Sequence, residues 1–211
     1  MTDPSAASPP SSAPAQRCWW AGPSEDYLRY HDTEWGIPVI NDQRLFEKIC
    51  LEGFQAGLSW LTILRKRDNF RRAFLDFDHE QVARFTSRSV DRLLKDPGIV
   101  RHRGKIEAAI NNAKRARELV QECGSLGTYL WRYEPAPESR PHPLTEARLR
   151  RMTMVPESFA LSRDLKRRGW KFVGPTTMYA FMQAMGLVND HVEGCIARPK
   201  AAQARAQLQI P

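Results

Sequence analysis

A histidine and a cysteine close to the C-terminus have the types and the spacing of a metal-binding pair. His191 and Cys195 lie four positions apart in the stretch LVNDHVEGC. Side chains at that spacing point the same way from a helix. Zinc prefers imidazole nitrogens and thiolates, usually four of them in a structural site. The pair therefore predicts half of a metal site and raises the question of where the other ligands lie.

An aromatic segment near the N-terminus, CWWAGPSEDYLRYHDTEWG, offers two further ligands, Cys18 and His31. A site that combines them with the C-terminal pair would close a very long loop, where a cross-link restricts the unfolded chain most. Cys50 falls instead on an apolar helical stripe, which suits a core position. The spacing from Cys18 to His31 is not that of a common zinc finger, so chance occurrence stays open on spacing alone.

A carboxylate interrupts an apolar helical stripe in the stretch ICLEGFQAGLSW. Glu52 shares one helical face with Leu45 and Ile49, because side chains three or seven residues apart on a helix point in similar directions. Burying a carboxylate is costly unless it has a partner or a purpose. Two explanations stay open: a glutamate at the edge of the stripe paired with an arginine, or one inside a pocket that binds a ligand or moves a proton.

The neighbourhood of this carboxylate is rich in aromatic residues. The N-terminal segment contains Trp19, Trp20, Tyr27, Tyr30 and Trp35, and Trp60 follows Glu52 by eight positions. Aromatic residues are usually core residues, but this segment is too irregular to form a helical core stripe. An aromatic cage beside a carboxylate suits a flat, cationic, nitrogen-rich ring.

Two glycine turns precede helical patterns, in DPGIVRHRGKIEAAI and in GWKFVGPTTMYAFMQAMG. Backbone N–H groups at a helix start can face a phosphate. The formal net charge of +8 favours a polyanion, with nucleic acid before an anionic membrane. Many basic proteins bind neither, and this alternative stays open. Together the turns and the charge favour a protein that holds a DNA backbone without reading its sequence.

The helical pattern that must position these residues extends over most of the 211 residues. Apolar spacings predict helices within 41–57, 59–74, 78–94, 96–124, 158–170 and 172–186. The expected fold class is all-α, with Asn41 or Asp42 as an N-cap and with Gly124 and Gly186 as helix stops. Residues 1–16, mostly Ser, Ala and Pro, should form a disordered tail, and residues 200–211 a flexible one.

The composition also bears on where the protein acts and on whether it binds a membrane. No apolar run is long enough to span a bilayer, and the N-terminus has no apolar stretch typical of a signal peptide. We therefore expect the cytoplasm, with the protein bound to the nucleoid through DNA, and no membrane partner. The four cysteines should then be reduced thiols or metal ligands.

Taken together, the chain resembles the bacterial 3-methyladenine DNA glycosylase I family of base excision repair. The matching stretches are RCWW, YHDTEWGIP, LFEKICLEGFQAGLSW, GIVRHRGKI and KFVGPTTMYAFMQAMGLVNDHVEGC, within a domain of residues 17–199. The match weakens around 134–160. The resemblance implies a helix-hairpin-helix fold, with two helical lobes and a base pocket between them. It implies that the protein binds double-stranded DNA containing alkylated adenine, and a single base pocket makes a monomer the natural expectation.

The resemblance also implies roles for individual residues. One structural zinc joins the termini, with its ligands at Cys18, His31, His191 and Cys195. The base-contacting carboxylate falls on Glu52, and the pocket aromatics fall on Tyr30, Trp60, Trp20 and Tyr27. DNA contacts fall on Gly174, Thr176, Gly57 and Leu58, the last two facing the gap that the flipped base leaves. A filled tetrahedral shell has no position for water, so the metal would not be the catalyst.

Two departures from related helix-hairpin-helix glycosylases bear on mechanism. A catalytic aspartate of those enzymes corresponds to Asn189, with Asp190 one step away, and their nucleophilic lysine corresponds to Thr176. Without that amine no Schiff base forms there, so we expect a monofunctional hydrolase that releases free 3-methyladenine. Phe54 stands where the family suggests a polar residue, and we expect it to pack in the core.

Two rival functions fit parts of the sequence. A DNA-binding protein that has lost its activity would keep the fold but has no use for Glu52 on an apolar stripe. A zinc hydrolase acting at the four proposed ligands would need an open coordination position. Binding of the free base separates the first rival from the glycosylase, and the effect of metal on stability separates the second.

Overall fold

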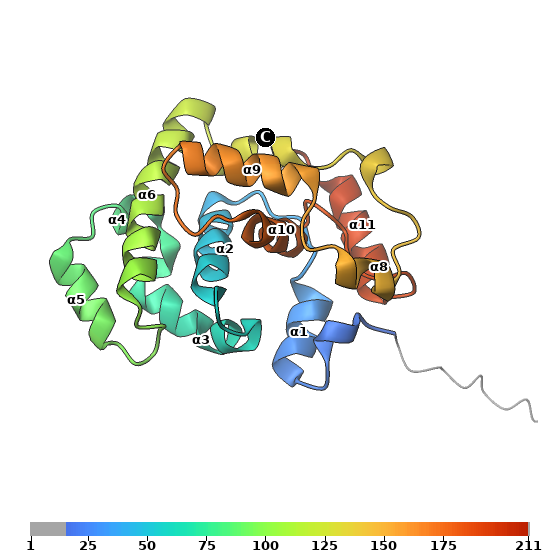
Figure 1. Ribbon diagram of the computed structural model, residues 1–211, viewed down its shortest axis with the longest axis horizontal. Coiled ribbons are helices and arrows are strands. Elements are labelled where there is room, and N and C mark those ends of the chain that lie inside the picture. Colours follow the sequence, from blue (N-terminus) through green and yellow to red (C-terminus); the bar gives the residue numbers. More distant parts are fainter. Residues whose placement is uncertain (1–15, 211) are drawn as a thin grey trace, which may run out of the picture.

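The computed structural model describes residues 16–210, and every regular element in that range is helical (Figure 1). The first half contains η1 (Trp19–Ala21), α1 (Glu25–Thr33), α2 (Asp42–Gln55), α3 (Trp60–Ala73), η2 (Leu75–Phe77), α4 (His79–Val82), α5 (Ser87–Lys95) and α6 (Arg103–Cys123). The second half contains α7 (Leu126–Leu130), η3 (Trp131–Tyr133), η4 (Pro137–Ser139), α8 (Glu146–Arg151), α9 (Pro156–Arg167), α10 (Pro175–Ala184) and α11 (Ala197–Gln207). The all-α prediction is confirmed. The predicted disordered tail lies outside the described residues, apart from Gln16.

The helix that carries Glu52 begins and ends where the local sequence predicts. The Asn41 side chain caps α2 by accepting a hydrogen bond of 3.0 Å from the Arg44 backbone N–H. The helix ends in a short turn in which Gly57 has a φ of 78°, a left-handed conformation that favours glycine. Ser59 then caps α3 by accepting from the Thr62 N–H at 3.2 Å. This turn sets the direction of α3 relative to Glu52.

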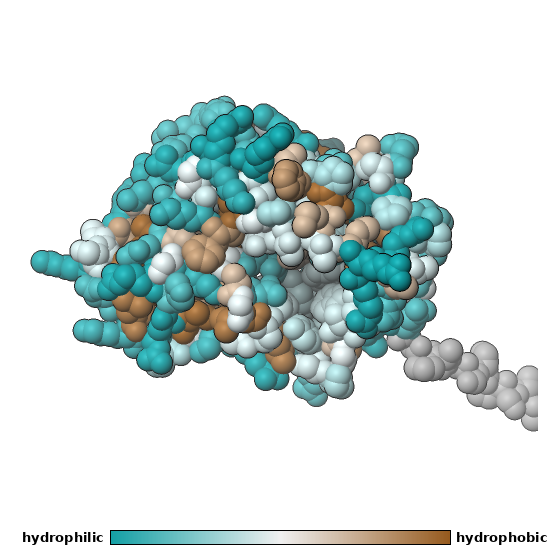
Figure 2. Space-filling view, viewed as in Figure 1, coloured by the Kyte–Doolittle hydropathy of each residue, from teal (hydrophilic) through white to brown (hydrophobic). Residues whose placement is uncertain are grey.

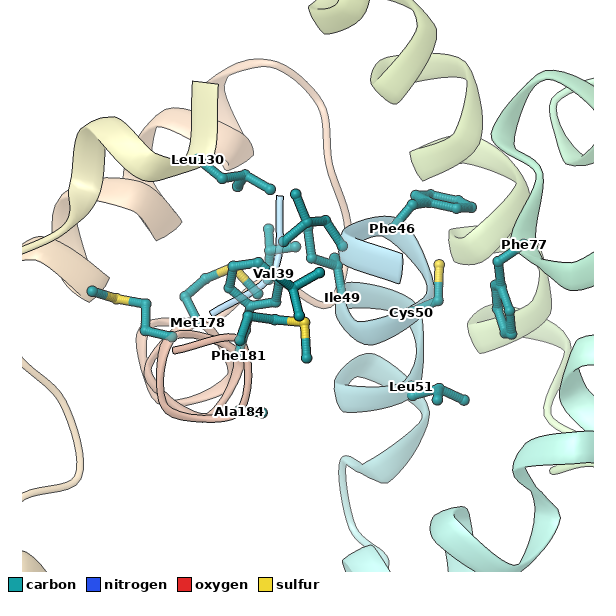
Figure 3. Close-up of a cluster of buried hydrophobic side chains, with 14 of the residues drawn as sticks. Val39, Phe46, Ile49, Cys50, Leu51, Phe77, Leu130, Met178, Phe181 and Ala184 are labelled. Carbon is teal, nitrogen blue, oxygen red and sulfur yellow. The ribbon is translucent and has the colours of Figure 1, made fainter. Parts of the chain in front are cut away.

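Helix α2 lies at the centre of the core and contacts α3, α6, α7 and α10 (Figure 3). Ile49 faces Phe181 of α10, whereas Phe46 and Cys50 face Phe77, so both sides of the helix are buried. Cys50 is therefore a core residue, as predicted. Phe54 is also buried, with its ring centroid 4.6 Å from that of Phe70. The expected core position of Phe54 is confirmed.

Helices α9 and α10 form a hairpin that the sequence predicted through its glycine turn. The connection of residues 168–174 ends at Gly174, which is the N-cap of α10, and Pro175 occupies the first helical turn. At the other end, Gly186 has a φ of 76°, and a Cβ there would lie 2.5 Å from the Pro38 nitrogen. The close approach lets the Val39 N–H donate to the Met185 carbonyl at 3.1 Å. The end of α10 is thereby tied to the segment that follows α1.

The predicted flexible tail of residues 200–211 is wrong for most of its length. Helix α11 runs to Gln207, Ala201 is buried, and Arg205 makes two hydrogen bonds of 2.6 Å to the Glu134 carboxylate. Alanine, glutamine and arginine have high helix propensity, but the segment has only a thin apolar stripe. Its partner Glu134 is remote in sequence, so periodicity could not reveal the docking.

The contact at Gly186 leads to a prediction about stability. We expect Gly186→Ala to lower the free energy of unfolding by about 3 kcal/mol, because the left-handed conformation costs about 1–2 kcal/mol and the clash with Pro38 adds about 1–3 kcal/mol. Gly124→Ala is the matched control, since Gly124 has a φ of 85° and a Cβ added there would meet nothing within 4 Å. Denaturant unfolding of both variants measures the difference. Equal losses would show that the close approach does not matter.

Candidate functional site

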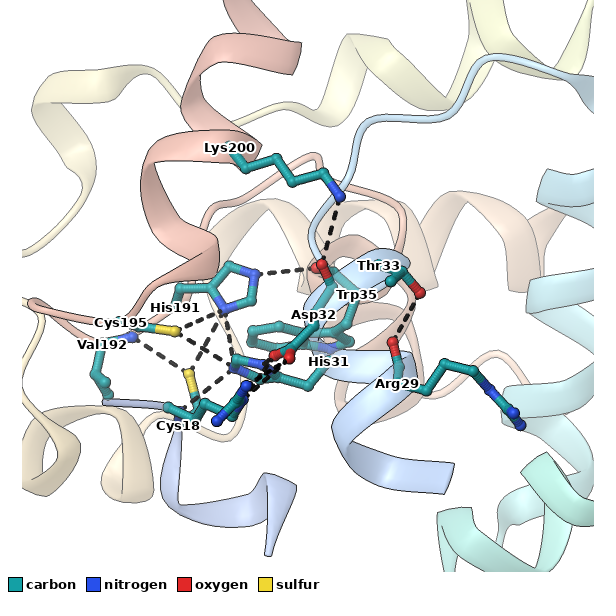
Figure 4. Close-up of polar contacts among 11 residues, drawn as sticks. Cys18, Arg29, His31, Asp32, Thr33, Trp35, His191, Val192, Cys195 and Lys200 are labelled. Carbon is teal, nitrogen blue, oxygen red and sulfur yellow. Dashed lines mark hydrogen bonds and ion pairs between the residues drawn. The ribbon is translucent and has the colours of Figure 1, made fainter. Parts of the chain in front are cut away.

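The four predicted metal ligands come together in the structure (Figure 4). One ligand atom from each of Cys18, His31, His191 and Cys195 lies within 4.8 Å of all the others, and all four residues are buried. Cys18 precedes η1, His31 lies on α1, and the other two lie in the connection between α10 and α11. The site therefore joins the two ends of the described chain.

The separations among the ligand atoms of His31, His191 and Cys195 match those around a tetrahedral ion of the size of zinc. His31 Nε2 lies 3.3 Å from His191 Nδ1. Cys195 Sγ lies 3.4 Å from His31 Nε2 and 3.5 Å from His191 Nδ1. Zinc bonds of about 2.3 Å to sulfur and about 2.0–2.1 Å to nitrogen, at tetrahedral angles, require separations of about 3.3–3.6 Å between such atoms.

Hydrogen bonds on the far side of each imidazole turn its free nitrogen toward the cluster. His31 Nδ1 lies 2.7 Å from Asp32 Oδ1, and the Arg17 guanidinium holds the pKa of that carboxyl below its usual range. His191 Nε2 lies 3.0 Å from the Trp35 carbonyl, which can only accept. Both rings therefore donate outward and leave a lone pair inward, the arrangement typical of metal-binding histidines.

Burial controls the protonation of the same residues. It lowers the pKa of His191 to about 4, so the ring is neutral and able to coordinate. It also raises the pKa of the Cys18 thiol to about 12, although the Val192 N–H donates to the sulfur at 3.4 Å. A metal ion would have to displace the thiol proton as it binds. The chemistry of the donor set therefore fits zinc.

A cavity of about 460 Å³ opens next to this cluster. One side is formed by η1, α1 and α8, and the other by α2, α3 and α10. Figure 2 shows a hollow in the middle of the face on which it opens. The aromatic residues singled out from the sequence all line the cavity, namely Trp19, Trp20, Tyr27, Tyr30, Trp35 and Trp60. The structure thus builds one cage from aromatic residues of separate elements.

Glu52 projects from α2 into the same cavity, beside two of these rings. Its carboxylate is buried, and burial raises its pKa. The rings of Tyr30 and Trp60 lie 5.4 Å apart at an angle of 46°. Trp20 packs edge-on against Tyr27 with centroids 5.9 Å apart. The predicted carboxylate and the four predicted pocket aromatics are therefore brought together.

The partner of Glu52 is a lysine, so the arginine alternative is wrong. Lys48 Nζ lies 3.5 Å from Glu52 Oε1 and donates a hydrogen bond of 2.6 Å to the Tyr30 hydroxyl. The same ammonium group lies over the Trp60 ring, 3.7 Å from its centroid. Lys48 precedes Glu52 by one helical turn, and that spacing was a signal available in the sequence.

The cavity contains a second carboxylate, that of Asp190, which directly follows Asn189 in the sequence. Asp190 is buried and forms an ion pair with Arg140, and it accepts hydrogen bonds from the Tyr179 hydroxyl and from Gln183 at 2.9 Å. Asn189 is turned toward α11, where its amide donates to the Arg198 carbonyl at 3.0 Å. The chain therefore places Asp190, rather than Asn189, at the cavity wall.

The predicted DNA contacts lie on two segments that are continuous with the cavity lining. Gly57 and Leu58 form the exposed turn between Gln55 and Trp60, both of which line the cavity. Gly174 and Thr176 begin α10, which contributes Ala180 and Gln183 to the wall. The turn thus lies next to residues of the cavity lining, and the helix start lies on an element that contributes to it, while contact of these four residues with DNA stays a prediction.

Comparison with known proteins agrees with this arrangement. A family profile described as methyladenine glycosylase matches residues 20–198. The DNA-3-methyladenine glycosylase 1 of Escherichia coli (strain K12) is 46% identical over 185 residues, which cover 87% of this chain and 97% of that protein. The similarity therefore extends over nearly the whole of the described chain.

Solved structures share the fold as well as the sequence. A crystal structure of a 3-methyladenine DNA glycosylase I is 47% identical with a TM-score of 0.79, and the match covers 86% of this chain and 98% of that one. A variant of 3-methyladenine DNA glycosylase I in complex with 3-methyladenine is 38% identical with a TM-score of 0.78, covering 86% and 97%. The fold is the all-helical one of these DNA glycosylase structures. The chain belongs to the methyladenine glycosylase family.

The ligand geometry predicts one tightly held metal ion per chain. We expect Cys195→Ser to lose the ion and to lower the melting temperature by several degrees or more, because metal binding contributes to the free energy of folding. Cys123→Ser is the control, since Cys123 lies on α6 outside the cluster. Elemental analysis and thermal melting, with and without a chelator, make the measurement. An unchanged melting temperature after complete metal removal would contradict a structural site.

Proposed function

We propose that the protein is a monofunctional DNA glycosylase that flips 3-methyladenine out of duplex DNA and hydrolyses its N-glycosidic bond. The observation that carries the proposal is the buried Glu52 beside Tyr30 and Trp60 in one cavity. The volume of about 460 Å³ is in the range of small-molecule sites. The names of the relatives and the complex of one of them with 3-methyladenine support the same substrate.

The pocket residues suit a base that carries positive charge. Methylation at N3 makes the adenine ring cationic and weakens its bond to the sugar, and aromatic faces attract such a ring over neutral adenine. Trp20 and Tyr27 extend the cage behind Tyr30. Glu52, when ionised, accepts hydrogen bonds from the amino-bearing edge of the base and stabilises positive charge as the bond breaks.

The leaving base departs neutral, so the reaction needs no strong general acid. Water then attacks the cationic sugar, and no covalent enzyme intermediate is required. Thr176 offers no amine for a Schiff base. Lys48 does carry one, but it is directed at Tyr30 and Glu52 and does not line the base cavity. These features support base release without strand cleavage.

Contacts with DNA are proposed at the start of α10 and at the turn between α2 and α3. Backbone N–H groups at the start of α10, around Gly174 and Thr176, would hold a phosphate. Gly57 has a φ of 78°, which keeps the adjacent turn narrow, and the neighbouring Leu58 is 42% exposed. An exposed apolar side chain at this place can fill the gap that the flipped base leaves.

We also propose that Cys18, His31, His191 and Cys195 hold one structural zinc ion. When bound, zinc would supply a rigid junction rather than a reactive water, because four protein ligands complete its shell. His31 directly follows Tyr30, so this junction would order the aromatic wall. One base cavity per chain suits a monomer, acting in the cytoplasm on the nucleoid. No helix among residues 16–210 has the length and apolar character needed to cross a membrane.

Replacement of the pocket carboxylate tests the chemistry. We expect Glu52→Gln to release free 3-methyladenine from methylated duplex DNA about 100-fold more slowly, because a charged acceptor is lost where charge develops. Glu47→Gln is the matched control: Glu47 also lies on α2, but it pairs with Arg71 at 2.9 Å and does not line the cavity. Chromatography of the released base measures both. No release by the unmodified protein would favour a DNA clamp without activity.

Replacement of the exposed apolar residue at the rim tests base flipping. We expect Leu58→Ser to slow release from duplex DNA by about 10-fold and to leave release from single-stranded methylated DNA unchanged, since only a duplex has a gap to fill. Ile40→Ser serves as the control, because Ile40 is 36% exposed and lies away from the cavity lining. Equal slowing on both substrates would argue against a wedge.

A further inference from the structure

The ammonium group of Lys48 lies between two cavities. The larger one is the base cavity, lined by Tyr30, Glu52 and Trp60, and Lys48 is not part of that lining. A smaller cavity on the other side is lined by Lys48 together with Tyr30 and Glu34. Lys48 therefore stands directly behind the residues that would hold the base, where it can act on them without touching the substrate.

The charged groups of α1 and α3 on this side of Glu52 are matched to each other, and Arg44 of α2, which also lines the smaller cavity, forms no ion pair with Glu52. Arg67 of α3 makes hydrogen bonds of 2.5 and 2.9 Å to both carboxylate oxygens of Glu34 on α1. Tyr30, also on α1, is uncharged because burial raises its pKa well above the usual value. Lys48 is then the one cation that contacts Glu52 among the residues that the structure describes.

The far wall of the cavity adds no free cation. Arg150 of α8 pairs with Glu146 at 2.7 Å, and its guanidinium lies over the Trp19 ring. Asp190 on the same cavity is paired with Arg140. A buried carboxylate without a cation tends to bind a proton, so the ionisation of Glu52 depends on Lys48 more than on any other residue.

Lys48 is itself held so that it can stay charged. Its side chain is only 6% exposed, as is that of Glu52. Burial lowers the pKa of Lys48 to about 8, while the nearby Glu52 carboxylate opposes that shift. The hydrogen bond to the Tyr30 hydroxyl and the contact with the Trp60 ring replace part of the lost hydration.

We propose that Lys48 is a positioning residue that keeps Glu52 ionised and fixed in the base cavity, so that the carboxylate accepts hydrogen bonds from an alkylated base at neutral pH. The proposal rests on the proposed function of Glu52. It extends that function to a residue which contacts neither base nor DNA. Lys48 acts through charge, and an arginine should replace it better than an apolar side chain of similar length.

The pH profile of base release tests the proposal. Glu52 must be ionised to act, so activity is present above the pKa of Glu52 and is lost as the pH falls through it. Without Lys48 that pKa rises. We expect Lys48→Met to move the acidic limb upward by about 1–3 pH units, so that release is at least about 10-fold slower at neutral pH and recovers at higher pH. Lys48→Arg should keep the limb close to that of the unmodified protein.

Two outcomes would overturn the proposal. One is a Lys48→Met protein with the unmodified pH profile, and the other is a loss that is equal at every pH, which indicates packing alone. Spontaneous release of the labile base is subtracted at each pH. In a Glu52→Gln background, Lys48→Met should cause no further loss, since a residue that acts through Glu52 has nothing left to act on.

A measurement on the free protein separates this proposal from the proposed enzyme activity. Nuclear magnetic resonance of the side-chain carboxyl carbons follows the titration of Glu52 directly, without DNA. A higher midpoint in Lys48→Met than in the unmodified protein supports the role of Lys48 even if no base is released. An unchanged midpoint refutes that role, whereas absent base release alone refutes only the glycosylase function.

Discussion

The junction between the two ends of the chain is the constraint on which the rest of the site depends. Cys18 and His31 are separated from His191 and Cys195 by most of the sequence, yet their ligand atoms lie within 4.8 Å of one another. Holding distant segments together has a large entropic cost for a flexible chain. A cross-link at this point would limit that cost, and it would reinforce the packing of α11 against α1.

The same junction is continuous with the wall of the base cavity. The Trp35 ring packs against His191 with centroids 4.8 Å apart and against Trp20 at 4.9 Å. Trp20 in turn reaches Tyr30 at 6.2 Å. A shift of the ligand cluster would therefore move Trp35, then Trp20 and then Tyr30. Tyr27 adds a second tie, because its hydroxyl accepts from the Leu61 N–H at 3.1 Å and connects α1 to α3. The cage is therefore anchored at both of its ends.

Much of the fold and of the site could be predicted from the sequence, where the signal was local or carried by whole motifs. Asn41 and Gly124 mark helix ends through their own backbone preferences. The stripe that contains Ile49 and Glu52 is a property of a single helix. The set of metal ligands was harder to predict. Spacing alone could not separate a metal site from a chance arrangement, and only the resemblance of long motifs placed Cys18 and Cys195 in one site. Helix α11 was missed because it docks through Arg205 and Glu134, whose pairing is a tertiary contact.

The lysine beside Glu52 shows why the charge balance of a site is harder to predict than its residues. A carboxylate on an apolar stripe implies a cation, and this chain contains 32 lysines and arginines that could supply it. Lys48 is the partner because it lies on the same helix one turn away. It therefore loses less conformational freedom on pairing than an arginine from another element would. The burial of the Lys48 side chain could not be predicted, however, because it depends on the rings of Tyr30 and Trp60, which lie on other helices. A buried cation–carboxylate pair is costly to desolvate. Its presence behind a cavity, rather than in a plain core, is therefore better explained by what the carboxylate does there than by stability.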